Sequence, residues 1–364
     1  MPRLVAVKPH ALSMTAREFV AASGGAPAAL SAYRAFHRRG ECGEAGSAGA
    51  PSAPGAVVHD EETVKFTLGV GGGLETESVI IPMPHRRGRF SRTLCVSSQV
   101  GCAMGCTFCE TAQMGLMRNL SPAEIVQQLW VARFGLGPGA ASIDISNIVF
   151  MGMGEPTDNL DAVLQAVEVM CDSNGCAIAS SRVAISTVGR VAGIARIGEF
   201  IQKPGFRRLG LALSLNAPND GIRSQIMPVN RADNMAALRQ ALQDFPMRRT
   251  AAICVEYVLI PGVNNLPEHC DEACAWLRGI RCSLNVIPYN PRRNSPWRAP
   301  TEDEINAFIA RAVANGQFTK RRMTKGRTAM AACGQLGNEG IRKRKLVALG
   351  ASVRSPGCPP EQSR

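Results

Sequence analysis

The spacing of hydrophobic and polar residues divides the chain at about residue 93. Beyond it, short apolar runs alternate with longer stretches whose apolar positions recur at helical spacing. The short runs predict strands at 93–99, 147–152, 182–187, 208–215, 252–260 and 283–288. The longer stretches predict helices at 122–134, 160–172, 191–201, 234–244, 267–278 and 302–314. Such alternation is typical of a parallel sheet, and six units are too few for a closed eight-stranded barrel. The pattern therefore predicts an α/β fold, a partial (β/α)6 barrel.

Two of the predicted helices have a recognisable start. Ser121 stands three residues before Glu124, and Thr301 stands three residues before Glu304, which is the spacing of a capping box. Pro122 takes the first helical position, where its missing amide hydrogen costs nothing. In a barrel of this kind we expect the functional side chains at the carboxyl ends of the strands.

The chain before residue 93 follows other patterns. Residues 1–39 predict one helix that begins near Ser13 or Thr15, and residues 40–56 are rich in Gly, Ala and Pro, as in a flexible linker. Two β-like runs flank Gly71–Gly73 and predict a hairpin. We therefore expect four regions: 1–56 (helical segment and linker), 57–92 (β-hairpin extension), 93–346 (partial barrel with a C-terminal cysteine segment) and 347–364 (disordered tail).

Composition narrows the class of protein. The 364 residues carry a net charge of +12 and a pI of about 9.4, which favours a polyanionic partner such as nucleic acid over a generically basic surface. Thirteen cysteines suit a reducing compartment, where they act as ligands, nucleophiles or small apolar residues. No apolar run approaches the length of a membrane span, and the N-terminus lacks the pattern of a secretion signal. We therefore expect a cytoplasmic protein without a membrane span.

Three cysteines after the first barrel strand carry the strongest chemical signal. Cys102, Cys106 and Cys109 have the spacing CxxxCxxC. Structural zinc takes four ligands, and the nearest fourth candidate is Cys95, on the preceding strand. A cubane iron–sulfur cluster can leave one iron without a protein ligand. We favour the cluster, with the open iron chelating the amino and carboxylate groups of S-adenosylmethionine, and keep zinc as the alternative.

Other signals stand at later strand ends. Gly154 and Glu155 follow the second strand, where glycine lets a ligand approach the backbone and the carboxylate can accept hydrogen bonds from an ammonium group. An ordinary Gly-rich turn is the alternative. Further polar residues at predicted strand ends are Ser186, Ser214, Asn216 and Asn290. Cys333 lies among small residues after the last barrel unit, as a reactive thiol or as a buried inert one.

Several longer strings extend these signals. They are Leu94–Cys102, Phe108–Gln113, Arg118–Leu120, Met151–Pro156, Leu213–Leu215 with Ala217–Asp220, Ile287–Pro291 and Ala332–Leu336. Together they resemble the RlmN/Cfr family of radical-SAM RNA adenosine methyltransferases (methyl synthases), over roughly residues 75 to 340. A generic radical-SAM enzyme would share only the three-cysteine loop and a looser Gly-Glu turn.

The resemblance implies a radical-SAM barrel with a [4Fe-4S] cluster on the three loop cysteines and two molecules of S-adenosylmethionine per turnover. Cys333 matches the cysteine that a first molecule methylates to S-methylcysteine, and a second molecule would yield a 5′-deoxyadenosyl radical. Cys95 matches the resolving cysteine, which forms a transient disulfide with Cys333. Glu77 matches a proton acceptor, a role that the Cys95 thiolate could also take. The residues that would contact S-adenosylmethionine are Gly154, Glu155, Ser186, Ser214, Leu215, Asn216 and Asn290.

The implied substrate is an adenosine of 23S rRNA, methylated at carbon 2 in preference to carbon 8, with tRNA as a further candidate. The implied electron donor is a flavodoxin or ferredoxin, and the implied state is a monomer. Two features depart from the family: Asn216 replaces the usual His, and the N-terminal region is shorter than the usual helical accessory domain. Two alternatives stay open, a radical-SAM enzyme for another substrate (tRNA or a protein undergoing maturation) and a non-enzymatic, metal-stabilised RNA-binding protein.

Overall fold

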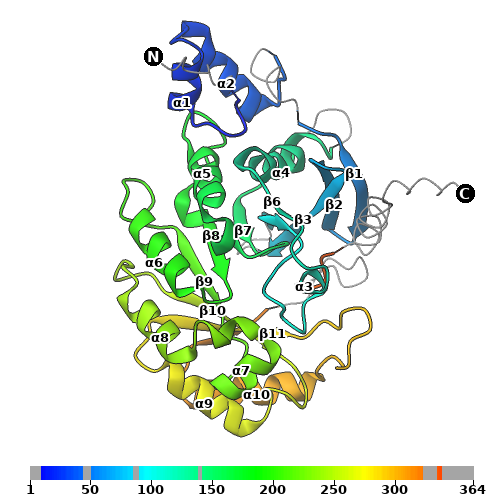
Figure 1. Cartoon of the computed structure of the whole chain (residues 1–364), viewed down its shortest axis with the longest axis vertical. Helices are drawn as coiled ribbons and strands as arrows, with labels where there is room; N and C mark the ends of the chain where they lie inside the picture. Colours follow the sequence, from blue (N-terminus) through cyan, green and yellow to red (C-terminus); the bar gives the residue numbers. More distant parts are fainter. Residues whose placement is uncertain (1–9, 44–50, 85–89, 138–141, 323–333, 338–364) are drawn as a thin grey trace, which may run out of the picture.

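The computed structural model describes residues 10–43, 51–84, 90–137, 142–322 and 334–337. Its main sheet has ten strands in the order β1-β2-β3-β4-β7-β8-β9-β10-β11-β12 (Figure 1). The neighbours from β4 to β12 pair in parallel, whereas β1 to β4 pair antiparallel. The predicted α/β fold with a partial barrel is confirmed, with a β-hairpin extension on one edge.

The parallel strands are β4 (Phe90–Cys95), β7 (Asn147–Phe150), β8 (Val183–Thr187), β9 (Gly210–Ser214), β10 (Ile253–Leu259), β11 (Cys282–Pro288) and β12 (Thr319–Arg321). The helices of the barrel are α3 (Glu110–Gln113), α4 (Pro122–Phe134), α5 (Leu160–Cys171), α6 (Val191–Phe200), α7 (Asp220–Ile226), α8 (Met235–Asp244), α9 (Pro267–Leu277) and α10 (Glu302–Ala314). Short 3-10 helices lie at η2 (Pro156–Asn159), η3 (Ser180–Arg182) and η4 (Pro228–Arg231). All six predicted strands and all six predicted helices have a counterpart; β12, α3 and α7 were not predicted.

The first barrel strand is shorter than its prediction of 93–99. β4 ends at Cys95, and Gln99–Val100 forms β5, which pairs with β6 (Arg118–Asn119) in a separate two-stranded sheet. The break occurs at Ser97, whose backbone amide donates to the Gln128 side chain on α4 instead of to a neighbouring strand. The chain thereby leaves the barrel sheet just before the cysteine loop.

The antiparallel extension consists of β1 (Pro54–Asp60), β2 (Thr63–Val70) and β3 (Leu74–Pro84). The predicted hairpin is present as β2 and β3. The unpredicted strand β1 begins inside the segment interpreted as linker, and its residues are mostly exposed. β3 pairs with β4, so the extension and the barrel share one continuous sheet.

The N-terminal region forms two helices, α1 (Ala16–Ala22) and α2 (Pro27–Arg39), so the prediction of one helix is wrong. The chain turns between them at Gly24 and Gly25, both with positive φ, and Pro27 starts the second helix. The predicted start near Thr15 is correct, because Thr15 caps α1 through a capping box. The Phe36 ring stacks on Trp130 of α4, which attaches the helical pair to the barrel.

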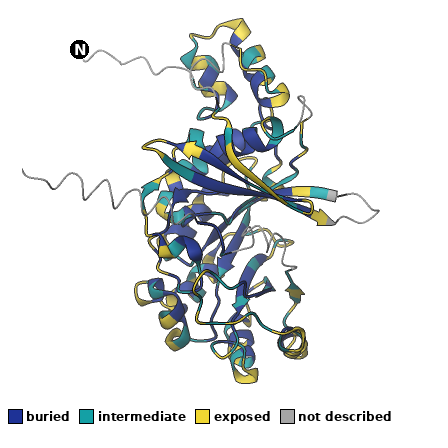
Figure 2. Cartoon of the chain, turned by 90° about the vertical axis from the view of Figure 1, so that its right-hand side faces the viewer, coloured by how far each residue is buried: buried dark blue, intermediate teal, exposed yellow. Residues whose placement is uncertain are grey.

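The core follows the sheet. Figure 2 shows the barrel strands largely in the colour of buried residues, with exposed residues gathered on the outer helices and on β1. No helix in the described part of the chain is both long and apolar enough to cross a membrane. The predicted tail 347–364 lies outside the described residues.

Candidate active site

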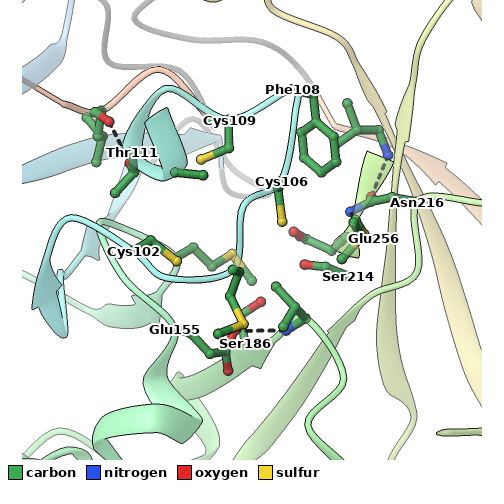
Figure 3. Close-up of a pocket in the computed structure, with 18 of the residues that line it drawn as sticks. Cys102, Cys106, Phe108, Cys109, Thr111, Glu155, Ser186, Ser214, Asn216 and Glu256 are labelled. Carbon is green, nitrogen blue, oxygen red and sulfur yellow. Dashed lines mark hydrogen bonds between the residues drawn. The ribbon is translucent and has the colours of Figure 1, made fainter. Parts of the chain in front are cut away.

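A pocket opens at the carboxyl ends of the parallel strands (Figure 3). One wall is the loop with Cys102, Cys106 and Cys109, and the opposite wall includes residues of β10 and residues at the ends of β7, β8, β9 and β11. The predicted residues that line it are Cys102, Cys106, Cys109, Gly154, Glu155, Ser186, Ser214, Asn216 and Asn290. The fold therefore brings side chains from five separate segments to one place.

The donor set on the loop suits a positively charged metal group. Burial raises the pKa of the Cys102 thiol to about 12 and raises the pKa values of Cys106 and Cys109 above the ordinary thiol value. Thiols with raised pKa values become thiolates only if a cationic group compensates their charge. In the described part of the chain, no three His, Cys, Asp or Glu side chains converge as ligands of a single metal ion. Three cysteine thiols on one loop are the donor type that an iron–sulfur cluster uses.

Gly152 and Gly154 are required by close packing. Gly154 has φ +99°, and a Cβ there would lie 2.5 Å from Cβ of Gln99. A Cβ on Gly152 would lie 2.6 Å from Oγ of Ser97 and 2.7 Å from the Val96 carbonyl oxygen. These glycines therefore let the loop after β7 lie against the segment between β4 and β5. The Gln99 side chain also accepts a hydrogen bond from the Glu155 amide at 2.8 Å.

The Glu155 carboxylate is buried and already holds the pocket wall together. Its Oε1 accepts hydrogen bonds from the Thr157 hydroxyl at 2.5 Å and the Thr157 amide at 3.1 Å, and its Oε2 accepts one from the Val188 amide at 2.9 Å. Burial raises the pKa of Glu155, while these hydrogen bonds oppose that shift. Oε2 accepts only one of these hydrogen bonds, so its second lone pair can still accept from an ammonium group.

Asn216 and Leu215 have structural partners. Asn216 has φ +57°, its Oδ1 accepts from the Val258 amide at 2.9 Å, and its carbonyl oxygen accepts from Asn264. Asn tolerates this left-handed backbone better than most residues. The Leu215 side chain is fully buried and does not line the pocket. Any contact of Leu215 with a ligand would therefore use its backbone.

Arg223 on α7 is a buried cation that sequence reasoning missed. Its guanidinium donates to the carbonyl oxygens of Ser214 at 3.2 Å, Leu215 at 3.1 Å and Val188, and to Oδ1 of Asn230 at 2.9 Å. Burial lowers its pKa to about 10. The side chain thus joins the ends of β8 and β9. Arginine in a short helix usually lies at the surface, so the sequence offered no signal for this role.

A second unpredicted feature is an ion pair that borders the pocket. Glu256 of β10 accepts from Nη1 of Arg322 at 2.8 Å and from Asn285 at 3.3 Å. The same Nη1 lies 3.4 Å from the Met151 sulfur. This pair connects Arg322, which follows β12, to the middle of the barrel. Arg322 is also the last described residue before the segment 323–333.

The C-terminal residues 334–337 dock beside the cysteine loop. The Gly334 carbonyl oxygen accepts from the Glu110 amide at 2.7 Å, and the Leu336 carbonyl oxygen accepts from the Thr111 hydroxyl at 2.5 Å. Gly334 and Leu336 both line the pocket. Cys333 itself lies outside the described residues, but the residue that follows it is part of the pocket wall.

Glu77 lies beside this segment, and neither Glu77 nor Cys95 is in the pocket lining. Oε2 of Glu77 accepts from the Gly337 amide at 3.1 Å and lies 3.8 Å from Nζ of Lys65. Burial raises the pKa of Glu77, and the Lys65 charge opposes the shift. Cys95 pairs with Val79 in the antiparallel register, two residues from Glu77. Glu77 and Cys95 therefore share one face of the sheet as diagonal neighbours, roughly 7–8 Å apart.

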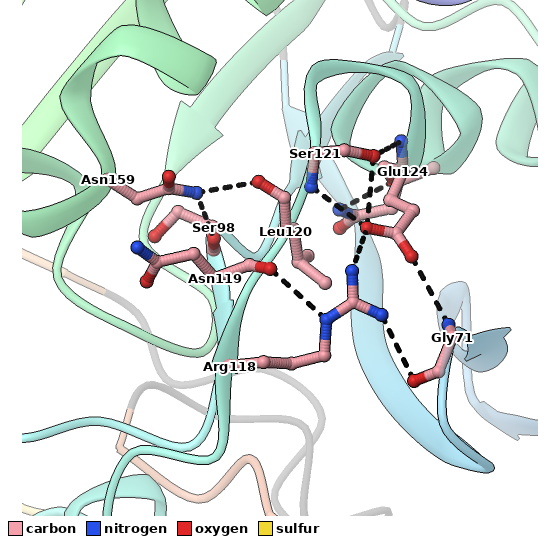
Figure 4. Close-up of polar contacts among 9 residues, drawn as sticks. Gly71, Ser98, Arg118, Asn119, Leu120, Ser121, Glu124 and Asn159 are labelled. Carbon is pink, nitrogen blue, oxygen red and sulfur yellow. Dashed lines mark hydrogen bonds and ion pairs between the residues drawn. The ribbon is translucent and has the colours of Figure 1, made fainter.

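Polar contacts attach the β2–β3 hairpin turn to the loop side of the barrel (Figure 4). Arg118 of β6 donates to the Gly71 carbonyl oxygen at 3.0 Å and pairs with Glu124 of α4 at 2.7 Å. Glu124 in turn accepts from the Gly71 amide at 3.3 Å and from Ser121, which closes the predicted capping box. We call Gly71, Arg118 and Glu124 the hairpin clasp. It holds the strand that carries Glu77 against the barrel.

Comparison with known proteins adds four findings. Residues 96–276 match the family model described as "Radical SAM superfamily". A protein of Protochlamydia amoebophila (strain UWE25), "Probable dual-specificity RNA methyltransferase RlmN 1", is 41% identical over 291 residues, which are 80% of this chain and 77% of that one. The "Dual-specificity RNA methyltransferase RlmN" of Syntrophobacter fumaroxidans is 41% identical over 278 residues, 76% of this chain and 77% of its own. The crystal structure of a radical SAM methyltransferase from Sphaerobacter thermophilus superimposes with a TM-score of 0.80 at 31% identity, over 90% of this chain and 98% of that one.

Proposed function

The chain belongs to the RlmN/Cfr family of radical SAM proteins, and on that premise we propose that it methylates an adenosine of 23S rRNA, at carbon 2 in preference to carbon 8. The observation that carries the proposal is the docking of residues 334–337 between the cysteine loop and Glu77. It brings the residue next to Cys333 into the wall of the pocket. A generic radical-SAM function leaves this arrangement unexplained.

Membership of the family implies a [4Fe-4S] cluster and S-adenosylmethionine. Cys102, Cys106 and Cys109 would hold the cluster, which supplies one electron for cleavage of S-adenosylmethionine when it is bound. Gly154, Glu155, Ser186, Ser214, Asn216 and Asn290 would hold the nucleoside and its methionine part, with Leu215 contributing through its backbone. The pocket residues come from neighbouring strand ends, which suits a ligand with several separate polar groups.

The remaining roles belong to the residues around the docked segment. The Cys333 thiolate would accept the methyl group that is later delivered to adenine, and Cys95 would release the product through a transient disulfide with Cys333. Glu77 would accept the proton that leaves the adenine carbon. Its raised pKa brings a carboxylate closer to the operating pH, which favours proton transfer in both directions.

The partners follow from the same family membership. We propose RNA as the substrate, with tRNA as a second candidate because the relatives are named dual-specificity RNA methyltransferases. The net charge of +12 supports a polyanionic partner. A small reducing protein such as a flavodoxin or ferredoxin would supply electrons to a monomeric, cytoplasmic enzyme.

The proposal is tested by anaerobic reconstitution with iron and sulfide, S-adenosylmethionine, a chemical reductant and an RNA fragment of the ribosomal peptidyl-transferase region. Mass spectrometry of the digested nucleosides should show 2-methyladenosine, and peptide analysis should show S-methylcysteine at position 333. Unmodified adenosine with every rRNA and tRNA fragment would contradict the proposal. 8-methyladenosine would contradict the choice of carbon 2 alone.

Two cysteine variants separate the roles. Cys333→Ala should abolish methylation, whereas Cys42→Ala changes an exposed cysteine outside the pocket and should leave methylation intact. Cys95→Ala should still acquire the methyl group at Cys333 but retain the RNA as a covalent adduct, visible on a denaturing gel. Release of free product by Cys95→Ala at the normal rate would exclude Cys95 as the resolving residue.

A further inference from the structure

Arginines gather at the amino ends of three neighbouring parallel strands, at the opposite end of the barrel from the pocket. The connections that lead into β9, β10 and β11 are residues 201–209, 245–252 and 278–281. They contain no Asp or Glu, and their basic residues are Lys203, Arg207, Arg208, Arg248, Arg249, Arg278 and Arg281. Because the strands pair in parallel register, these residues come to one end of the sheet.

A groove lies among these connections. It is lined by Arg207, Arg208 and Arg248, by the hydroxyl-bearing residues Ser181 and Thr250, and by Gly210 and Leu211 at the start of β9. The three arginines are exposed. We call this site the amino-end groove. The side-chain donors of these residues are guanidinium groups and hydroxyls, which together suit phosphate oxygens.

The arginines of the groove are not neutralised. In the described part of the chain, the ion pairs involve other basic residues, and Lys203 pairs with Glu168 on α5. Arg207, Arg208 and Arg248 therefore have no carboxylate partner there. Like charges held close together repel, so a bound anion would stabilise the groove.

Attraction to helix C-termini does not account for the cluster. The helix macrodipole favours cations within the last turn of a helix. α6 ends at Phe200, well before Arg207, and Arg248 follows the end of α8 at Asp244 after an intervening proline. Arg281 serves instead to position the rim, because it donates to the Arg249 carbonyl oxygen at 2.6 Å.

We propose that the amino-end groove binds the phosphodiester backbone of the RNA substrate, remote from the adenosine that enters the pocket. This inference rests on the proposed function. The five residues of β9 span roughly 13–16 Å between the two ends of the barrel, so the contacted phosphates lie several nucleotides from the target. An acidic electron-donor protein fits this position poorly, because it must approach the cysteine loop at the other end.

The test compares a short RNA hairpin, which reaches only the pocket, with a longer fragment that carries flanking helices. In the double variant Arg207→Glu/Arg248→Glu, affinity for the long RNA should fall about tenfold at about 0.1 M salt. The slope of log affinity against log salt should become shallower by about 1.5, as expected for the loss of two phosphate contacts. Affinity for the short hairpin and release of 5′-deoxyadenosine without RNA should be unchanged.

A matched control has the same change of net charge at another place. Arg196→Glu/Arg311→Glu alters two exposed arginines that are paired with Asp161 and Asp271, and it should affect the long RNA much less. Circular dichroism and thermal unfolding would establish that both double variants are folded. The proposal would be overturned if both double variants lost the same affinity for the long RNA, or if the groove variant lost affinity for the short and long RNA alike. It would also be overturned if the groove variant lost flavodoxin binding while its RNA affinity stayed unchanged. If the wild type methylates no RNA but the groove variant still selectively loses the long RNA, the groove stands and the proposed function fails.

Discussion

The backbone amide of Gly337 donates a hydrogen bond to Oε2 of Glu77 at 3.1 Å, across 260 positions of sequence. This contact joins the β-hairpin extension to the segment that follows Cys333. Glu77 therefore combines an observed property, acceptance of a hydrogen bond from the docked segment, with a proposed one, acceptance of a proton. A variant that keeps the first and removes the second distinguishes them.

Glu77→Gln should lower the rate of RNA methylation by about 10²- to 10⁴-fold, because glutamine can accept from Gly337 but cannot take a proton at neutral pH. Methylation of Cys333 should be unaffected, as measured by peptide mass spectrometry. Glu75→Gln is a matched control, since residue 75 lies on the same face of β3, two positions away. A full rate of RNA methylation in Glu77→Gln would show that another base acts.

Arg223→Met should lower the free energy of unfolding by about 3–5 kcal/mol, because three carbonyl oxygens and the Asn230 side chain lose their donor inside the protein. Arg223→Lys retains the charge but not the planar fork, and should lose about half as much. Urea denaturation measures both values. A change below about 1 kcal/mol in Arg223→Met would mean that the carbonyl groups find other donors or water.

Gly154→Ala should prevent binding of S-adenosylmethionine or destabilise the fold by several kcal/mol. The added methyl group meets Gln99 at 2.5 Å, and the residue also has to keep a positive φ. Gly262→Ala separates the two effects, since Gly262 has φ +74° but no atom within 4 Å of the place that a Cβ would take. It should cost only about 1 kcal/mol. Calorimetric titration with S-adenosylmethionine and thermal unfolding report binding and stability, and equal effects at the two glycines would show that packing against Gln99 is unimportant.

In the hairpin clasp, Arg118 and Glu124 should contribute to stability as a coupled pair. Arg118→Ala and Glu124→Ala should each destabilise the protein by about 1–2 kcal/mol, because each breaks contacts with Gly71 as well as the ion pair. The double variant should lose less than the sum of the single variants, as expected for residues in one network. Thermal unfolding of the four proteins gives the coupling energy. Strict additivity would indicate that the two residues act independently.

The N-terminal helical pair should make stability depend on pH. Burial lowers the pKa of His37 on α2 from 6.5 to about 4, so the unfolded chain binds this proton more readily than the folded one. Neutral His37 therefore contributes up to about 3 kcal/mol to the free energy of unfolding. This contribution is fully present above pH 6.5 and is lost as the pH falls towards 4. His37→Gln should flatten this part of the curve, whereas His59→Gln, on the exposed strand β1, should not. The same slope in both variants would locate the dependence elsewhere.

The sequence predicted the elements whose pattern is local. Each barrel helix of ten or more residues buries one face or is buried throughout, and α4 and α10 begin and end at the predicted residues. The strand β1 escaped prediction because it is a mostly exposed edge strand without apolar alternation. The helix α7 escaped because it has seven residues, including Gly221.

The residues of the candidate site also fall into two groups, those that the sequence pattern indicated and those that only the fold brings together. The three loop cysteines and Glu155 carry chemistry in their spacing and their place at strand ends, and they line one pocket. Arg223 and Glu256 have no such signal, because their partners are carbonyl oxygens and a distant arginine that only the fold brings near. The reason for Gly154 was also hidden in the sequence, since its neighbour Gln99 lies on another segment.

The unbroken sheet from β1 to β12 has a consequence for the timing of the proposed reaction. Glu77 and Cys95 lie on paired strands of that sheet, so their distances from Ser186 and Ser214 are set once the protein has folded. In the proposed reaction, Cys333 would have to approach the methyl donor, then adenine and then Cys95. Because the sheet holds Cys95 and the pocket residues in place, these approaches would not come from movement of the sheet. The chain would travel instead at residues 334–337, where four hydrogen bonds hold the backbone and the Gln335 side chain. Turnover would then proceed as a sequence of dockings of one short segment onto a stationary frame.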